Sequence, residues 1–171
     1  QNLNESVQRF DAKIKAIYQK SADYKIFDSL PGAGAAMGPR LMAFFGEDRE
    51  LFATAEDVLK RSEIAPILKE SGKYRSVRRR FQCDTYTQLT FVEFARGSRV
   101  KSKWAKAFYD MQKERGKSHY TILRALAFKW IRIIFKCWKD SIPYDEEKYL
   151  KSLVKRKSPI VHFFKENEKT G

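Results

Sequence analysis

Hydrophobic residues recur every three to four positions at the start of the chain, and polar residues fill the positions between them. Leu3, Val7, Phe10, Ile14 and Ile17 alternate in spacings of four and three. This is the seam of a heptad repeat, and it predicts a helix with one apolar edge. A little over two heptads leaves two interpretations open. The helix can pair with a second copy of the chain, or it can lie on the core of its own domain.

Two apolar segments then flank a turn. The sequence runs from Tyr24 to Leu30, continues through Pro31-Gly-Ala-Gly34, and resumes an apolar pattern from Ala35 to Phe45. Proline and glycine side by side mark a tight turn, so the pattern predicts helix, turn and helix. Pro39 is compatible with the second helix because it lies early in that helix.

The remaining pattern also favours helices, so we predict a mainly α fold. Residues 82–95 fit either helix or strand, and we predict a helix that ends at a turn formed by residues 96–98. The best-defined helix is 119–138, which has an apolar edge and a basic edge. Trp130 and Trp138 lie on the apolar edge and are predicted to be core residues rather than platforms for stacked bases.

The net charge indicates the kind of partner that the protein binds. The chain has 35 Lys and Arg against 21 Asp and Glu, a net charge of +14, so its expected partner is a polyanion. Apolar runs such as residues 131–135 are too short and too interrupted by bases to span a membrane, so nucleic acid is favoured over a membrane. No secretory signal is evident, and we expect a cytoplasmic, nucleoid-associated protein. The chain begins inside a predicted helix, and we expect a further portion upstream of it.

The charges are unevenly placed. Residues 45–63 carry six acids against three bases, whereas residues 69–80 hold the densest positive charge in the chain. That basic segment surrounds Ser71-Gly72 and contributes Lys69, Lys73, Arg75, Arg78, Arg79 and Arg80. The basic edge of the predicted helix 119–138 adds Arg124 and Arg132. We expect these cations to contact DNA, while the acidic segment faces away from it.

The turn at residues 30–34 is a second candidate contact with nucleic acid. Gly32 and Gly34 let the backbone turn sharply and leave free amides at the start of the following helix, where the helix dipole favours an anion. Leu30 to Gly34 resembles the turn of the helix-hairpin-helix motif, which holds one backbone phosphate without reading bases. The alternative is an ordinary helical hairpin whose glycines only turn the chain.

Ser71 is the candidate nucleophile. Attack of a serine on a phosphodiester requires an accessible turn, a base or metal to take the proton, and cations around the transition state. The flanking arginines could supply the cations. The nearby acids do not form an evident cluster, and two Cys and two His show no zinc-type spacing, so no metal site is predicted in this chain. A base or metal must come from elsewhere.

Several short motifs in a fixed order resemble one family. They are Leu30-Pro-Gly-Ala-Gly34, Ile64-Ala-Pro66, Ser71-Gly-Lys73, Trp104-Ala105, Arg115-Gly-Lys-Ser-His119 and Arg124-Ala-Leu-Ala-Phe-Lys-Trp130. Each is weak alone, but together they resemble the C-terminal transposase domain of insertion sequence 110 family transposases, over residues 27–159. One departure is Ser62-Glu63 before Ile64-Ala-Pro66, where members often have glycine.

The resemblance implies a site-specific DNA recombinase in which Ser71 becomes covalently linked to cleaved DNA. It implies an N-terminal RuvC-like domain with four acids that bind Mg²⁺, a coiled-coil linker, and an element-encoded RNA that bridges donor and target DNA. Residues 1–23 would then be the linker helix and a route to homo-oligomers, and 24–158 the transposase domain. Residues 159–171 are predicted to be a weakly ordered tail. The isolated chain is expected to be inactive. Non-catalytic binding of DNA or of structured RNA remains the alternative.

Overall fold

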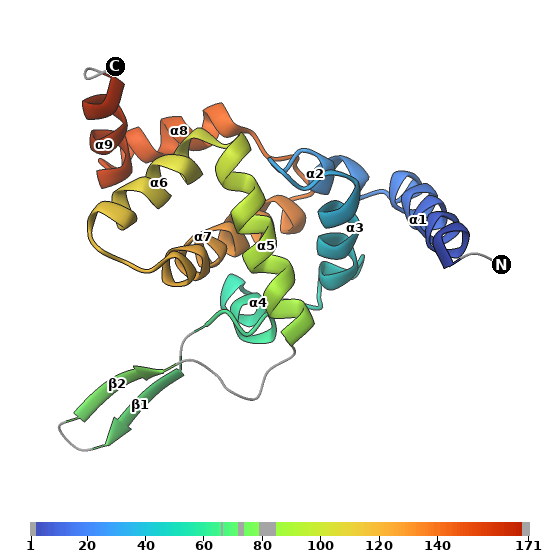
Figure 1. Cartoon of the computed structure of the whole chain (residues 1–171), viewed down its shortest axis with the longest axis horizontal. Helices are drawn as coiled ribbons and strands as arrows, with labels where there is room; N and C mark the ends of the chain where they lie inside the picture. The colour runs from blue at the N-terminus through green and yellow to red at the C-terminus, as the bar shows by residue number, and fades with distance from the viewer. Residues whose placement is uncertain (1–2, 66, 72–73, 79–84, 169–171) are drawn as a thin grey trace.

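The computed structural model describes residues 3–65, 67–71, 74–78 and 85–168. Within them the chain is mainly α-helical, as the sequence predicts (Figure 1). The elements are α1 (Leu3–Lys20), α2 (Tyr24–Asp28), α3 (Gly34–Phe45), α4 (Ala55–Arg61), β1 (Ile67–Ser71), β2 (Tyr74–Arg78), α5 (Thr85–Lys101), α6 (Lys103–Glu114), α7 (His119–Lys139), α8 (Glu146–Lys155) and α9 (Pro159–Glu168).

Polar side chains fix the starts of four of these helices. Thr54, Ser102, Ser118 and Asp145 each accept a hydrogen bond from the backbone N–H three residues further on. Such N-caps satisfy donors that the first helical turn leaves unpaired. At Thr54 the contact is reciprocal, because the Asp57 carboxylate accepts from the Thr54 backbone N–H at 2.9 Å. The helix boundaries therefore follow local sequence chemistry.

The core lies where α3, α4, α5, α6 and α7 meet. Trp104, Trp130, Trp138, Phe45 and Phe91 are fully buried there, which confirms the prediction that Trp130 and Trp138 are core residues. Both indoles also find polar partners. Trp130 donates to the Ser98 hydroxyl at 2.7 Å and Trp138 to the Gly46 carbonyl at 2.8 Å. Burial of an indole N–H is favourable only with such a partner.

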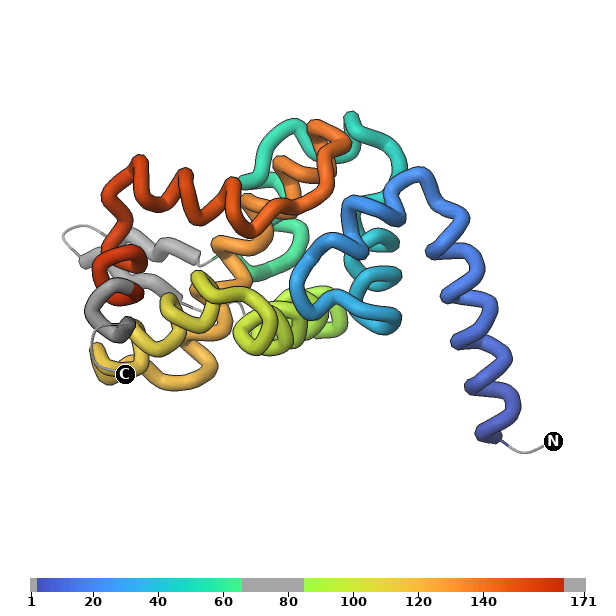
Figure 2. Tube along the Cα trace, turned by 90° about the horizontal axis from the view of Figure 1, so that it is seen from above, coloured from blue at the N-terminus to red at the C-terminus, as the bar shows by residue number. Residues whose placement is uncertain are grey.

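Helix α1 leaves the helical body instead of lying on it (Figure 2). The side chains of its apolar edge, Leu3, Val7, Phe10, Ile14 and Ile17, are 48% to 78% exposed. The interpretation in which this edge packs on the chain's own core is therefore wrong. Only Tyr18 of α1 is buried, and it packs against α3 so closely that a Cβ on Gly38 would lie 2.3 Å from the Tyr18 hydroxyl oxygen.

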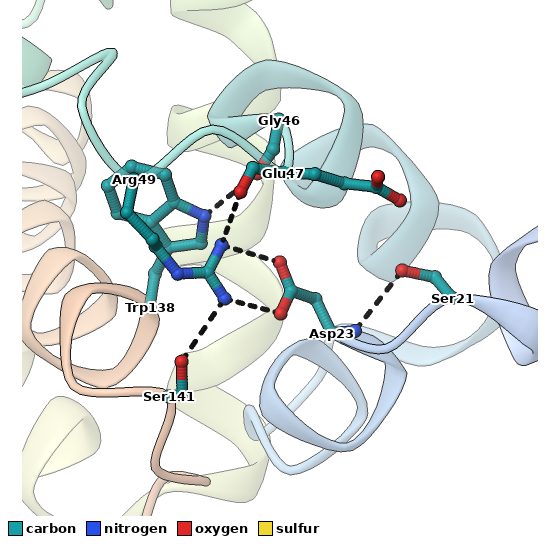
Figure 3. Close-up of polar contacts among 7 residues, drawn as sticks. All are labelled: Ser21, Asp23, Gly46, Glu47, Arg49, Trp138 and Ser141. Carbon is teal, nitrogen blue, oxygen red and sulfur yellow. Dashed lines mark hydrogen bonds and ion pairs between the residues drawn. The ribbon is translucent and has the colours of Figure 1, made fainter.

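Arg49 ties the start of α2 to the end of α7 (Figure 3). Its two terminal nitrogens donate to the two carboxylate oxygens of Asp23, and its guanidinium lies 4.8 Å from the centroid of the Trp138 ring. The Asp23 side chain is only 8% exposed. A buried carboxylate with a bidentate guanidinium partner fixes geometry more strictly than a surface pair does. This contact fixes the junction between the end of α1 and the start of α2 against the core.

The turn predicted at residues 96–98 is wrong, because α5 continues through it to Lys101. Gly97 instead lies inside the helix, where the carbonyl oxygen of Gly32 is 3.6 Å from the position that a Cβ on Gly97 would occupy. That distance is an ordinary van der Waals contact, so the space around Gly97 does not itself require glycine. The close approach of the two elements constrains Gly32 instead, where a Cβ would lie 2.8 Å from the Gly97 carbonyl carbon, and Gly97 does not break the helix.

The tail predicted to be weakly ordered is instead largely helical. Residues 159–168 form α9, which packs on α6, and Ile160 is 4% exposed. Val161, Phe163 and Phe164 are partly buried against the core. The spacing of these apolar residues is that of a helix with one buried edge.

The sequence did not predict the hairpin of β1 and β2. The two strands pair antiparallel, with Ser71 opposite Tyr74 and Ile67 opposite Arg78. Two residues, Gly72 and Lys73, separate the paired ends and lie outside the described residues. A Gly-x pair between short strands is a known hairpin signal, but the dense charge around it hid the strand pattern.

Candidate nucleic-acid interface

Ser71 is the last residue of β1, at the far end of a hairpin that projects from the helical body (Figure 1). Two of its predicted neighbours in the site, Arg75 and Arg78, belong to β2. Lys73, Arg79 and Arg80 lie outside the described residues. The strand pairing therefore brings the backbone of Ser71 beside the segment that carries Arg75 and Arg78.

The register separates these two arginine positions. Ser71 is opposite Tyr74, Glu70 is opposite Arg75, and Ile67 is opposite Arg78. Alternate positions along a strand belong to the same face, and opposed positions share a face. Position 78 is thus on the face of Ser71, whereas position 75 is on the other face with Glu70. The pairing thus assigns positions 75 and 78 to opposite faces of the hairpin.

Two side chains hold the chain where it leaves α4 toward the hairpin. The Arg124 guanidinium donates to the carbonyls of Glu63 at 3.5 Å and Ile64 at 3.3 Å, and the Gln88 amide donates to the Glu63 carbonyl at 3.0 Å. Glu63 has φ 59°, a backbone conformation that favours glycine. Ser62-Glu63, the segment that departs from the glycine expected by resemblance, thus includes a residue with positive φ whose carbonyl is held by two side chains.

Arg124 was expected to contact DNA, and the structure places it against the chain itself. Its side chain is partly buried between α7 and the segment that precedes β1. The residue that sequence reasoning missed is Gln88, which is 5% exposed. A buried glutamine on an otherwise apolar helix face is the signal that could have indicated a polar anchor.

Arg132 is half-exposed and paired. Its guanidinium donates to the carboxylate of Glu56 on α4 and lies 5.2 Å from the centroid of the Phe128 ring. Its side chain is 52% exposed, so part of the guanidinium still faces solvent. The acidic segment is therefore not wholly remote from the basic edge of α7. One of its acids partly neutralises Arg132.

The turn between α2 and α3 has the geometry that the sequence predicts, but its two glycines differ. Gly32 has φ +85°, and a Cβ there would lie 2.8 Å from the carbonyl carbon of Gly97. Gly34 has φ +52°, and a Cβ there would meet nothing within 4 Å. Helix α3 begins after Ala33 and has no side-chain cap. Gly32 serves packing, while Gly34 opens the first turn of α3 to solvent.

The predicted site residues that the structure describes do not form one cluster. The hairpin and the α2–α3 pair lie at different ends of the helical body (Figure 1). Arg124 and Arg132 belong to α7, which runs through the core. In the part of the chain that the structure describes, no three His, Cys, Asp or Glu residues are grouped to hold a metal ion. No described helix is long and apolar enough to cross a membrane.

The structure thus consists of a helical body, a projecting hairpin whose first strand ends at Ser71, and a glycine turn between α2 and α3. Comparison with known families shows which family this sequence belongs to. The family described as Transposase IS116/IS110/IS902 matches residues 24–110, just over half of the chain. The chain therefore belongs to this transposase family, and the resemblance drawn from its motifs is confirmed. The matched region contains the α2–α3 turn, the hairpin and α5.

Two curated proteins are similar to the chain. The mini-circle putative transposase for IS117 of Streptomyces coelicolor is 27% identical over 135 residues, which are 79% of this chain and 33% of that protein. The insertion element IS900 uncharacterized 42 kDa protein of Mycobacterium paratuberculosis is 24% identical over 143 residues, 83% of this chain and 36% of that protein. The chain thus spans about a third of the length of each relative.

Proposed function

We propose that this chain is the serine-bearing, DNA-handling part of a site-specific recombinase, with Ser71 as the nucleophile. The observation that carries the proposal is the place of Ser71. It ends β1 on a hairpin that projects from the body, inside the region matched by the transposase family (Figure 1). A projecting hairpin can reach a phosphodiester in duplex DNA without displacing any core element.

The proposed reaction transfers a phosphoryl group from a sugar oxygen of DNA to the Ser71 oxygen. The Ser71 oxygen attacks the scissile phosphorus and forms a phosphoserine ester, and the bond from that phosphorus to one sugar oxygen breaks. The serine proton passes to a base outside this chain, and the released sugar oxygen takes up a proton. Because one phosphate ester replaces another, the bond energy is kept for rejoining. Cations on β2 and beyond would stabilise the negative charge that develops on the phosphoryl oxygens.

The activation of the serine belongs to another part of the protein. The resemblance assigns Mg²⁺ to four acids of an upstream RuvC-like domain, where the metal would activate the nucleophile or stabilise the leaving oxygen. The described residues offer no carboxylate cluster for it. We therefore assign to this chain the serine, the hairpin that carries it and the surrounding cations, and we expect the isolated chain to be inactive.

The α2–α3 turn is assigned to backbone binding. The uncapped first turn of α3 and the open side of Gly34 offer amides to one DNA phosphate, as in a helix-hairpin-helix. Base sequence would be read by pairing with an element-encoded bridge RNA. The exposed apolar edge of α1 would bind the same edge of a second copy and so form a homo-oligomer. Action on chromosomal DNA would place the protein in the cytoplasm, at the nucleoid.

The test is a covalent adduct. Protein that carries this chain together with its metal-bearing domain is incubated with donor and target DNA, the element RNA and Mg²⁺, and then denatured. We expect a protein–DNA adduct that survives denaturation, and its loss in Ser71→Ala. Ser76→Ala, which changes the other serine of the hairpin, is the matched control and should keep the adduct. An undiminished adduct in Ser71→Ala would refute the proposal in favour of non-catalytic binding.

A further inference from the structure

The middle of α7 carries a partly buried lysine that has no acidic partner among the described residues. Lys129 lies one turn before Arg132, and its ammonium is 5.1 Å from the centroid of the Phe108 ring on α6. The ion pairs formed between described residues do not include Lys129. Its charge is therefore held against an aromatic ring rather than against a carboxylate.

A second cation without an acidic partner among the described residues, Arg156, directly follows α8. Its guanidinium donates to the backbone carbonyl and hydroxyl of Ser152 and lies 5.9 Å from the centroid of the Tyr149 ring. Tyr149 in turn packs on Trp104 of α6, with ring centroids 4.9 Å apart. Trp104 lies one turn before Phe108 on α6, so the ring that supports Arg156 packs on the same helix that carries the ring beside Lys129.

The surroundings of Lys129 disfavour the charged form of its side chain. Burial lowers the pKa of its ammonium, and the positive charges of Arg156 and then Arg132 lower it further. Arg132 is paired with Glu56, but the ion pairs formed between described residues include neither Lys129 nor Arg156. A desolvated cation beside like charges costs stability unless an anion approaches it. The arrangement is that of a site whose counter-ion comes from a partner.

We propose that Lys129 and Arg156 together bind a backbone phosphate of duplex DNA. The proposal rests on the proposed function, which makes DNA the substrate. Helix α8 extends the same positive surface through the exposed residues Lys148, Lys151 and Lys155, which share one helix edge over two turns. Two turns span about 10 Å, which suits a run of phosphates better than a single small anion. This contact is separate from Ser71 and from the α2–α3 turn.

The test measures binding and stability of the 171-residue chain together. Fluorescence anisotropy gives the affinity for a 20-base-pair duplex at several salt concentrations, and thermal unfolding is followed without DNA. Lys129→Met keeps the packing on Phe108 and removes the charge. We expect about a tenfold loss of affinity and a salt slope smaller by about one. We also expect a higher Tm, because the unpaired charge is gone. Arg156→Gln should lower affinity in the same way.

Two comparisons make the result decisive. Lys15→Met removes one exposed charge from α1 and should leave both the salt slope and Tm unchanged. The assay measures binding of an uncleaved duplex by the 171-residue chain, which is expected to be inactive, so failure of the covalent chemistry would not affect this measurement. The proposal is overturned if Lys129→Met and Arg156→Gln bind duplex DNA like the parent chain, or if Lys129→Met lowers Tm without changing affinity. A folded RNA hairpin serves as a second probe in the same assay. If the variants lose affinity only for that RNA, duplex DNA is overturned as the ligand.

Discussion

Gly32 and Gly97 lie in direct backbone contact, although 65 positions separate them in the sequence. A Cβ on Gly32 would be 2.8 Å from the Gly97 carbonyl carbon and 3.0 Å from its oxygen. This contact sets how closely the α2–α3 turn approaches α5. It also divides the two glycines of the turn into one that is required for packing and one that is free to meet a ligand.

The two turn glycines should respond differently to alanine. Gly32→Ala combines a backbone clash with φ +85°, and we expect a loss of roughly 2–4 kcal/mol in unfolding free energy. Gly34→Ala has open space, so only the left-handed backbone opposes it, at about 1–2 kcal/mol. Chemical denaturation of both variants measures the difference. Equal losses would mean that the Gly32–Gly97 contact does not limit packing.

Gly34→Ala also tests phosphate binding at the turn. A methyl group there would project into the space in front of the first turn of α3, so we expect weaker binding of duplex DNA by a folded protein. Anisotropy at fixed salt measures this affinity. Ala43→Gly, on an exposed position late in the same helix, is the control for a small change in stability. Parent-like affinity in Gly34→Ala would leave the turn with a structural role only.

Arg124 should control the hairpin rather than overall DNA affinity. Arg124→Ala removes hydrogen bonds to the carbonyls of Glu63 and Ile64, and we expect a loss of about 1–3 kcal/mol in stability. Amide hydrogen exchange in residues 67–71 and 74–78 should accelerate more than exchange in α7. Gln88→Leu should act in the same direction through the Glu63 carbonyl. Unchanged exchange in the strands of both variants would show that these side chains do not anchor the hairpin.

The bidentate contact between Arg49 and Asp23 offers a double-mutant cycle. Asp23→Ala removes the carboxylate partner of Arg49, whose side chain is only 25% exposed. We expect a loss of about 3 kcal/mol in unfolding free energy. Arg49→Ala also removes the contact with Trp138, and the double variant should cost less than the sum of the single variants. Unfolding in denaturant gives all three values. Additive losses would mean that the two side chains do not depend on each other.

The exposed edge of α1 should mediate self-association. Phe10 and Ile14 are 61% and 48% exposed, and Asp at either position would disrupt an apolar seam while leaving the helical body intact. Sedimentation of the parent chain should show concentration-dependent association that both variants lose. Lys13→Asp, a charge change beside the seam, is the control. A parent chain that stays monomeric at all concentrations would leave the edge without this role.

The sequence was a good guide where one pattern had one physical meaning. The apolar edge of residues 119–138, the buried Trp130 and Trp138, and the turn at 30–34 follow from periodicity and glycine placement. It failed at Gly97, because a glycine inside a helix looks the same in sequence as a glycine that ends one. It also failed at β1 and β2, where two short charged strands carry a weak alternating pattern.

Side-chain direction was the other part that the sequence could not supply. Arg124 and Arg132 look alike on the basic edge of α7, yet one holds backbone carbonyls and the other pairs with Glu56. Lys129 lies between them and was not singled out, because its lack of an acidic partner among the described residues depends on how α6, α7 and α8 pack. Charge counts predict a polyanionic partner, but only packing shows which cations are left for it.

The most direct measurement is the location of the covalent phosphate. The protein–DNA adduct formed by the metal-bearing protein is digested with nuclease and protease, and the modified peptide is sequenced by mass spectrometry. The account predicts a nucleotide remnant on Ser71, at the end of β1. A remnant on any other residue, or an adduct of the same yield in Ser71→Ala, would contradict it.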